Sequence, residues 1–529
     1  MTTQETKVET VVSLPVLSGP AEARTNYFDA EHLRPALKGH AIRGARSIFV
    51  AQTCGYVVTT IGFMVLARIL SPEDFGLVAM VLPLNMILQN FGTNGFTDAV
   101  IQKAAIHHRQ VSTLFWINLA INMTLSLLFL AAGPAIASFY NEPRLNRVVM
   151  AFSCSILVGG ISTQHQALLK RNMQFHKTAF CEMVAMIVAM VVAIVLAWRG
   201  FSYWALVARW LTIPVIVASG SWILCDWRPG LPARNTGVWS MVRYGMAIYP
   251  TYLTTELRRN ADKILLGRFA GSHALGFYER ACNFATLLAS QMMNPLMNVA
   301  LVTFSRLRND PAEYRRNYLK VLSVLAFVCM PLSAALALIG KDLILLLLGS
   351  QWGRAGDLFS VLALSTGVMI IYQTQAWHHL ALGATGRFWR WSMVSLLVTI
   401  LLFVAGLPFG AMGVAVAYTA SFYILIGPGL WYAGQPIQLK VSAVFSVLWK
   451  FFIAAFISGI LCWFCFYGYS ATAGLFWEWY RLARIVAAAT TFFLVYLALV
   501  VLMFGDVSPI TQLTAVVRQM MPGRFRKED

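Results

Sequence analysis

Residues 63–80 read FMVLARILSPEDFGLVAM, and residues 263–280 read KILLGRFAGSHALGFYER. In each stretch an apolar run ends near an arginine, a short turn follows, and the next apolar run begins with an apolar residue and a glycine. At one fixed offset, Arg68 corresponds to Arg268 and Gly76 to Gly276. The repetition indicates two similar halves, each of which begins with two helices joined by such a turn.

The composition is that of an integral membrane protein. The chain has 529 residues, of which 58% are hydrophobic and 12% charged, and its mean hydropathy is +0.65. Soluble domains carry about 25% charged residues. The net charge of +19 comes from bases scattered singly between apolar runs. This pattern favours membrane topology and contact with anionic lipid headgroups over nucleic-acid binding.

The sequence shows no motif for nucleotide hydrolysis, metal binding or nucleophilic catalysis. Gly340 and Lys341 lack the upstream glycine and the following Ser or Thr of a phosphate-binding loop. His378 and His379 are adjacent, so they point about 100° apart on a helix and make a poor chelate. The eight cysteines lie in or beside apolar stretches, which predicts no structural disulfide. We therefore expect no enzyme activity, no metal and no cofactor.

Fourteen apolar runs reach the length of about 20 residues that a bilayer core requires, and none alternates as a barrel strand does. This predicts an all-α polytopic membrane protein with 14 transmembrane helices. Lys and Arg concentrate in the N-terminal tail and in the loops on its side, which places both termini in the cytoplasm. The predicted segments are a flexible cytoplasmic N-tail (1–43), a first lobe (44–225), a second lobe (226–434), two further helices (435–505) and a cytoplasmic C-tail (506–529).

The repeat fixes how the two halves are related. Its offset places the first predicted span on the seventh, and a shift of six spans preserves orientation across the membrane. The halves are therefore expected to be parallel repeats, related by a pseudo-twofold axis along the membrane normal. Two such halves with a cleft between them suggest alternating access.

The sequence around the two turns resembles a known family. LARILSPEDFGLVAMV, followed by FGTNGFTDAVIQ, resembles the start of the polysaccharide-transport branch of the multidrug/oligosaccharidyl-lipid/polysaccharide (MOP) exporter superfamily. ADKILLGRFAGSHALGFYERA, followed by NPLMNVALVTFSRLRND, resembles the matching start of its second half. The resemblance covers about residues 40–505 and is greatest to Wzx-type flippases of the exopolysaccharide, colanic-acid-like branch.

The resemblance implies a MOP/MATE-like fold of two six-helix lobes around a central cavity, with two helices added at the C-terminal end. It also implies a bacterial inner-membrane protein that moves an undecaprenyl-diphosphate-linked oligosaccharide from the inner to the outer leaflet, for exopolysaccharide or lipopolysaccharide biosynthesis. The implied partners are this lipid-linked substrate, membrane lipids and the polysaccharide polymerase and export machinery. The resemblance does not fix the sugar or the coupling ion, H⁺ or Na⁺.

Ionisable side chains within spans are costly and call for a reason. The richest set is TTELRRNADK at 254–263, which includes Arg258, Arg259 and Lys263. An arginine can hold phosphate oxygens in two parallel hydrogen bonds, so the set is a candidate diphosphate site. Glu256 and Asp262 could instead neutralise the arginines at i,i+3 and i,i+4 spacing. The same two acids are the candidates for cation coupling.

Other polar residues extend the candidate site. Arg209, a lone cation within a span, either faces the cavity or reaches toward the membrane surface, and Arg46 either meets headgroups at the cytoplasmic end of the first span or is an ordinary topology residue. Amide and aromatic side chains suit sugar hydroxyls. The candidate saccharide contacts are Asn85, Gln89, Asn90, Gln373 and Trp377. Hydrogen bonding between packed helices is an equally good interpretation of these amides.

Two other transport functions fit the same fold. A cation-coupled multidrug exporter of the MATE type would favour a buried acidic site, whereas the charges here lean cationic. A peptidoglycan lipid-precursor flippase also fits fourteen spans, although the turn sequences look more like the exopolysaccharide branch. A membrane glycosyltransferase would need acidic catalytic residues and a large outer loop, and neither is visible.

Overall fold

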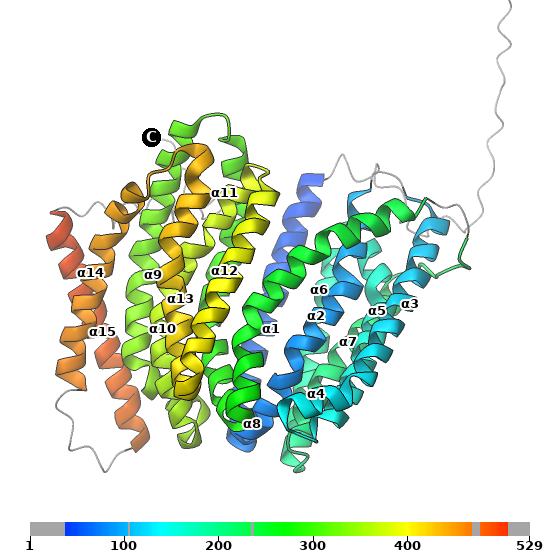
Figure 1. Ribbon diagram of the computed structural model, residues 1–529, viewed down its shortest axis with the longest axis horizontal. Helices are drawn as coiled ribbons and strands as arrows, with labels where there is room; N and C mark the ends of the chain where they lie inside the picture. Colours follow the sequence, from blue (N-terminus) through cyan, green and yellow to red (C-terminus); the bar gives the residue numbers. More distant parts are fainter. Residues whose placement is uncertain (1–36, 104–105, 234–236, 468–476, 506–529) are drawn as a thin grey trace, which may run out of the picture.

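The computed structural model describes residues 37–103, 106–233, 237–467 and 477–505, and within them every regular element is helical. Helices α1–α7 pack together as a first lobe, α8–α13 form a second, and α14 and α15 lie at the outer edge of the second lobe (Figure 1). The first lobe contains α1 (Leu37–Ile69), α2 (Pro72–Gln102), α3 (His108–Ala131), α4 (Gly133–Tyr140), α5 (Leu145–Arg171), α6 (Phe175–Trp198) and α7 (Trp204–Leu224). The remainder are α8 (Trp239–Arg306), α9 (Pro311–Leu348), α10 (Gly353–Gln373), α11 (Gln375–Ala381), α12 (Thr385–Gly406), α13 (Gly410–Gly434), α14 (Val441–Phe466) and α15 (Trp477–Phe504).

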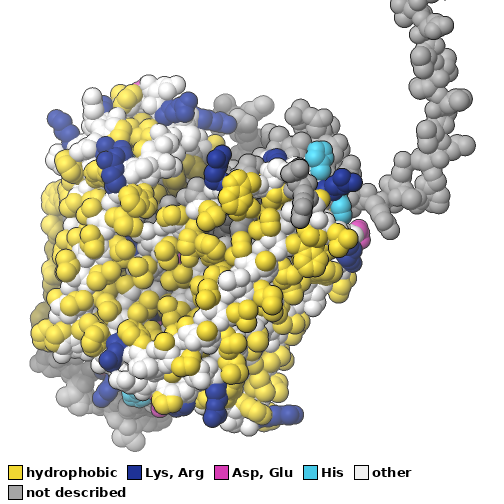
Figure 2. Space-filling model, turned by 45° about the vertical axis from the view of Figure 1, so that its right-hand side comes forward, with side chains coloured by type: hydrophobic (Ala, Val, Ile, Leu, Met, Phe, Trp, Pro, Cys, Tyr) yellow, Lys and Arg dark blue, Asp and Glu magenta, His cyan; other side chains and the backbone are white. Residues whose placement is uncertain are grey.

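The outer surface is built to meet lipid. Figure 2 shows apolar side chains across the middle of the visible face, with Lys and Arg gathered at its two ends. Eleven stretches of the described helices are long and apolar enough to cross a membrane, and one of them spans both α12 and α13. The all-helical, polytopic fold is as predicted. The count of fourteen spans, the segment boundaries and the cytoplasmic position of the termini stay predictions, and both predicted tails lie mostly or wholly outside the described residues.

Helix α8 contains the second of the two quoted turns. Its 68 residues bend at Gly271, whose φ of 79° and ψ of 177° are incompatible with a continuing helix. The bend divides α8 into a first arm (239–270) and a second arm (272–306), which we use as names below. Figure 1 shows the bend at the lower end of the molecule, beside the junction of α1 and α2.

The first turn is stabilised by its own sequence, SPED. The Ser71 hydroxyl and backbone N–H both donate to Asp74 Oδ2, over 2.7 and 2.9 Å, and Asp74 N–H donates back to Ser71 Oγ. These bonds form a capping box with an aspartate in the usual glutamate position, and Pro72 occupies the first helical position, where no N–H is needed. Asp74, one of the two acids that interrupt the apolar sequence, therefore caps the start of α2.

The repeated glycines lie where the two lobes cross. A Cβ on Gly76 would lie 1.7 Å from the Ser272 carbonyl oxygen, and a Cβ on Gly276 would lie 1.8 Å from the Pro72 carbonyl oxygen. Only glycine permits so close an approach of two backbones. Each half of the repeat thus supplies the glycine against which the other half packs, which explains why the pattern occurs twice.

Further contacts fasten the lobes at this junction, which we call the joined end. The Trp352 indole N–H and the Gln351 amide donate to the Ala67 carbonyl over 2.8 and 2.6 Å. Arg68 donates to the Leu346 carbonyl over 2.9 Å. Carbonyls in the last turn of a helix have no partner within it, so the second lobe satisfies the end of α1. The ring of Phe75 packs edge-on against Trp352.

The last two helices are anchored to the second lobe through α9. Asp342 of α9 is buried and pairs with Arg484 of α15 over 2.5 Å, and the Tyr467 hydroxyl, just after α14, donates to it over 2.9 Å. The hydroxyl of Tyr496 on α15 donates to the carbonyl of Phe327 on α9 over 3.0 Å. Both helices are therefore attached to the outer edge of the second lobe through α9.

The glycine crossing predicts opposite effects for one substitution at two sites. Gly276→Ala should destabilise the protein by about 1–3 kcal/mol, because the added methyl group must separate α2 from the second arm of α8. Gly159→Ala is the matched control, since a Cβ there meets nothing within 4 Å and alanine stabilises a helix by about 0.4–1 kcal/mol. The measurement is the apparent Tm of the purified protein in detergent. Equal Tm values for the two variants would contradict the assigned packing.

Candidate functional site

A cavity of about 750 Å³ lies between the lobes, lined by α1, α2, both arms of α8 and helices α10–α13. It extends from Phe63, near the joined end, toward Met297 and Trp377, which lie farther along α8 and on α11. Most of its lining is apolar or aromatic. All charged residues that line this cavity belong to α8. Four of them lie on its first arm, and the fifth, Arg280, lies on its second arm.

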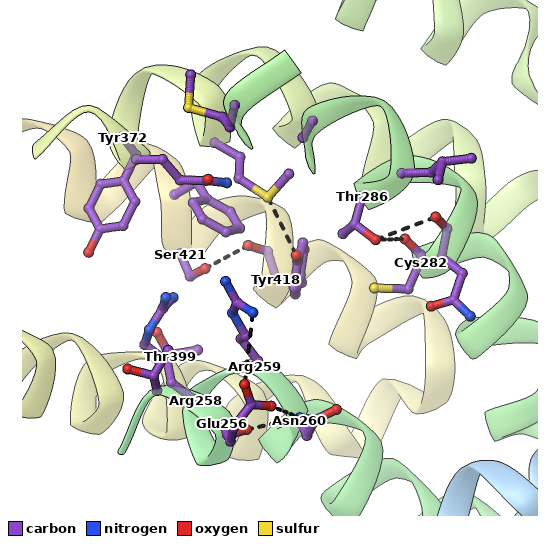
Figure 3. Close-up of a pocket in the computed structure, with 18 of the residues that line it drawn as sticks. Glu256, Arg258, Arg259, Asn260, Cys282, Thr286, Tyr372, Thr399, Tyr418 and Ser421 are labelled. Carbon is purple, nitrogen blue, oxygen red and sulfur yellow. Dashed lines mark hydrogen bonds and ion pairs between the residues drawn. The ribbon is translucent and has the colours of Figure 1, made fainter. Parts of the chain in front are cut away.

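The first arm of α8 contributes Arg258, Arg259 and Lys263 to the cavity lining, and we call these three residues the cationic wall. Figure 3 shows Arg258 and Arg259 pointing into the cavity from α8, with Tyr418 and Ser421 of α13 beyond them. Arg259 is 66% exposed and lies 3.9 Å from Glu256, the outer limit of an ion pair. Among the described residues, Arg258 has neither an ion pair nor a hydrogen bond. Lys263, one turn beyond Arg259, also faces the cavity, as the shared helical face predicts.

Asp262 does not neutralise these arginines. Its side chain is buried, and the Tyr278 hydroxyl of the second arm donates to Oδ2 over 2.7 Å. Oδ1 has no hydrogen-bond partner among the described residues. The i,i+4 pair with Arg258 that the sequence allows is therefore not formed. Glu256 accepts a hydrogen bond from Asn260 Nδ2 over 3.3 Å and makes only the long contact with Arg259. Local pairing leaves positive charge uncompensated on this wall.

A smaller cavity of about 280 Å³ adjoins the first on the side of α7. Both cavities share six lining residues, namely Phe63, Met86, Asn260, Lys263, Arg280 and Asn283. Arg209 of α7 lines the smaller one, so the structure places it inside the protein rather than toward the membrane surface. Its side chain is buried, and its Nε has no hydrogen-bond partner among the described residues.

The smaller cavity contains charged residues that the sequence did not single out. Arg280 pairs with Glu279 over 2.5 Å, and Asn283 donates to the other carboxylate oxygen over 2.5 Å. The guanidinium carbons of Arg209 and Arg280 lie 4.7 and 4.4 Å from the centre of the Phe63 ring. Such cation–π contacts stabilise buried cations without neutralising them. The only sequence signal was the dipeptide Glu279–Arg280 within an apolar span.

The candidate saccharide residues divide into two groups. Gln373 and Trp377 line the larger cavity, where Gln375, Thr399 and Ser421 add further polar groups. Trp377 is almost wholly buried and stacks on Phe304, so most of its ring is covered. Gln373, Gln375 and Trp377 lie on α10 and α11, whereas Thr399 and Ser421 lie beside Arg258 and Arg259 (Figure 3).

Asn85, Gln89 and Asn90 line neither of these cavities. Gln89 donates to the Ser155 hydroxyl over 3.0 Å, and that hydroxyl lies 3.4 Å from Asn85 Oδ1, within a buried contact between α2 and α5. The geometry of Asn85 and Gln89 matches the alternative of hydrogen bonding between packed helices. Asn90 is partly buried on the same helix. Arg46 belongs to α1, but its side chain lies outside the described residues.

Comparisons with known proteins agree with this architecture. The family model described as "Polysaccharide biosynthesis protein" matches residues 65–357. The chain is 26% identical to the teichuronic acid biosynthesis protein TuaB of Bacillus subtilis (strain 168), over 81% of this chain and 89% of that one. It is 26% identical to the succinoglycan biosynthesis transport protein ExoT of Rhizobium meliloti (63% and 68%) and 23% identical to the lipopolysaccharide biosynthesis protein WzxC of Escherichia coli K12 (60% and 65%).

Two solved structures show the same fold at low sequence identity. The lipid II flippase MurJ, in an inward closed conformation, aligns with a TM-score of 0.69 at 15% identity, over 87% of this chain and 99% of that one. An inward-facing multidrug-resistance MATE transporter of the MOP superfamily aligns with a TM-score of 0.59 at 12% identity, over 75% and 99%. At these identities the likeness concerns the fold alone.

Proposed function

Because the chain belongs to the polysaccharide biosynthesis protein family, we propose that it is a flippase for a lipid-linked oligosaccharide. The proposed substrate is an undecaprenyl-diphosphate-linked repeat unit, moved from the inner to the outer leaflet of the bacterial inner membrane for exopolysaccharide or lipopolysaccharide biosynthesis. The protein changes the position of its substrate and forms no covalent bond with it.

The observation that most supports this proposal is the unbalanced positive charge between the lobes. The two cavities and the carboxyl beside them bring together five cations and three acids, which leaves two positive charges in excess: Arg209, Arg258, Arg259, Lys263 and Arg280 against Glu256, Asp262 and Glu279. Charge enclosed in an apolar protein costs several kcal/mol per ion unless it is compensated. A diphosphate diester carries two negative charges, so its headgroup matches this excess in sign and size.

The polar and aromatic lining of the larger cavity suits the sugars. Gln373, Gln375, Thr399 and Ser421 offer donors and acceptors to hydroxyl groups, and aromatic rings of α12 and α13 lie among them. A substrate whose diphosphate lies against the first arm of α8 could extend its saccharide toward Gln373 and Gln375. Of the residues first considered for sugar contact, Gln373 and Trp377 remain in this proposal; Asn85, Gln89 and Asn90 line neither cavity and are not part of it.

Alternating access follows from where the lobes are fastened. They cross at Gly76 and Gly276, while the cavity extends away from that end. If the predicted topology holds, the joined end faces outward and the cavity is reached from the cytoplasm. Release to the outer leaflet then requires the glycine crossing to separate and the opposite ends of the lobes to approach.

Two other transport functions are outcomes of the same tests. The fold likeness to a lipid II flippase is compatible with a peptidoglycan precursor as the substrate. A protein with that substrate would restore growth to a strain depleted of its own lipid II flippase. The fold likeness to a MATE transporter, together with buried Asp262, leaves a cation-coupled drug exporter. The excess of positive charge disfavours cationic drugs, and an ethidium efflux assay separates this function from the proposed one.

Substitution of the cationic wall tests the proposed function. In a host that lacks its own flippase, the double variant Arg258→Gln, Arg259→Gln should lower polymer export by roughly tenfold or more, since removal of a hydrogen-bonded charge costs about 2–5 kcal/mol. Lipid-linked intermediate should accumulate at the cytoplasmic face. Arg199→Gln, which removes an exposed arginine between α6 and α7, is the control. Wild-type export at wild-type protein level in the double variant would overturn the diphosphate assignment.

Asp262 is the stronger of the two candidates for the coupling ion, because it is buried with one oxygen unpartnered, whereas Glu256 hydrogen-bonds to Asn260. Asp262→Asn should abolish the dependence of export on the driving gradient, because the amide can neither release a proton nor balance Na⁺. The measurement is export with the proton or sodium gradient collapsed by ionophores. Unchanged gradient dependence in this variant would remove Asp262 from the mechanism.

A further inference from the structure

The smaller cavity lies between the cationic wall and the joined end. Its lining runs from Lys263 and Asn260, which it shares with the larger cavity, to Phe75, Val78 and Ala79 of α2. Phe75 itself packs on Trp352 at the joined end. An anion that moves from the cationic wall toward the joined end would therefore pass through this cavity.

The cations of this cavity differ from those of the cationic wall in burial. The Arg280 side chain is 7% exposed and Arg209 is buried, whereas the Arg259 side chain is 66% exposed. Arg209 lies against Phe63 and Trp210 and has an unfilled Nε donor among the described residues. A guanidinium so deeply buried, with a donor unused, is a site prepared for an oxyanion.

Glu279 supplies an oxyanion from within the protein. One carboxylate oxygen accepts from Arg280 and the other from Asn283, both at 2.5 Å. A carboxylate and a phosphoryl group present similar pairs of charged oxygens to an arginine. With Glu279 in place, this cavity still holds Arg209 and Lys263 without an ion pair among the described residues.

We propose that the smaller cavity is a second phosphate station and that Glu279 is its displaceable counterion. This inference rests on the proposed function, because the ligand is the diphosphate that the first-arm wall receives. At the second station, phosphate oxygens accept from Arg209 and Lys263 and take the place of the Glu279 carboxylate on Arg280. Lys263, which lines both cavities, accompanies the anion from one station to the other.

Displacement of Glu279 gives the station a means of release. Buried cations with no internal anion would hold a diphosphate so tightly that it would not leave. Glu279 competes for the same guanidinium, which lowers the affinity, and it reoccupies Arg280 when the ligand departs. A fixed structural ion pair between Glu279 and Arg280 would have the opposite consequence, because loss of the carboxylate would leave Arg280 buried and unpaired and would bring no gain in affinity for phosphate.

The test uses inorganic pyrophosphate as the probe and the full-length protein in lipid nanodiscs. Glu279→Gln should bind pyrophosphate about tenfold more tightly than wild type, because the internal competitor is lost, and should export polymer more slowly. Arg209→Gln should bind it about tenfold more weakly. Asp357→Asn, which removes a surface acid paired with Lys341, is the matched control and should leave both readouts unchanged. Isothermal titration calorimetry gives the affinities.

A second variant guards against misfolding of Glu279→Gln. Asn283→Ala removes only the neutral donor that holds Glu279, so it should tighten pyrophosphate binding by a smaller factor. Weaker or unchanged binding in both variants would overturn the displaceable counterion. If Arg258→Gln, Arg259→Gln lost pyrophosphate binding while Arg209→Gln kept it, the second station would fail and the flippase proposal would stand. If no variant changed binding or export, the proposed function itself would fail.

Discussion

Positive charge held between two apolar lobes is the constraint on which this structure depends. Arg258 has no ion pair among the described residues, Arg259 has only a long contact with Glu256, and Arg209 is buried with an unfilled donor. The buried charge of Arg209 is costly, and its cation–π contact with Phe63 reduces the cost without removing it. A protein that binds an anion transiently needs this imbalance, because internal acids that fully neutralised the arginines would leave no affinity for a diphosphate.

The joined end makes that imbalance useful for transport. The reciprocal approach of Gly76 and Gly276 brings two backbones together at one end of the lobes, and contacts of Trp352 and Gln351 with α1 reinforce it. The contact also includes aromatic packing of Phe75 on Trp352, so separation of the lobes at this end would break backbone packing, hydrogen bonds and an apolar contact together. The cavities lie immediately beside it, so a change at the joined end alters the surroundings of the buried arginines directly.

The sequence was sufficient for the helical class and for the repeat, because long apolar runs and a fixed offset are local or one-dimensional signals. It was also sufficient to place Arg258, Arg259 and Lys263 together, since helical spacing puts them on neighbouring faces. It could not predict that Asp262 pairs with Tyr278, because the bend at Gly271 determines which residue of the second arm lies opposite.

The remaining site residues required tertiary structure. The smaller cavity forms where α7 meets the second arm of α8, and no spacing in the sequence relates Arg209 to Arg280. For Asn85 and Gln89 the sequence identified the residues but left two roles open. Amides within a span fit both sugar binding and helix packing, and only the position of Ser155 on α5 favours packing. Polar residues on a helix can thus be located from sequence, whereas their partners cannot.

The most direct test of the central claim is a cryo-electron microscopy map of the full-length protein in nanodiscs with its lipid-linked diphosphate intermediate. The account predicts phosphate density between the lobes, within hydrogen-bond reach of Arg258 and Arg259 or of Arg209 and Arg280, with saccharide density toward Gln373. A map with the headgroup on the lipid-facing surface and no phosphate density between the lobes would contradict it.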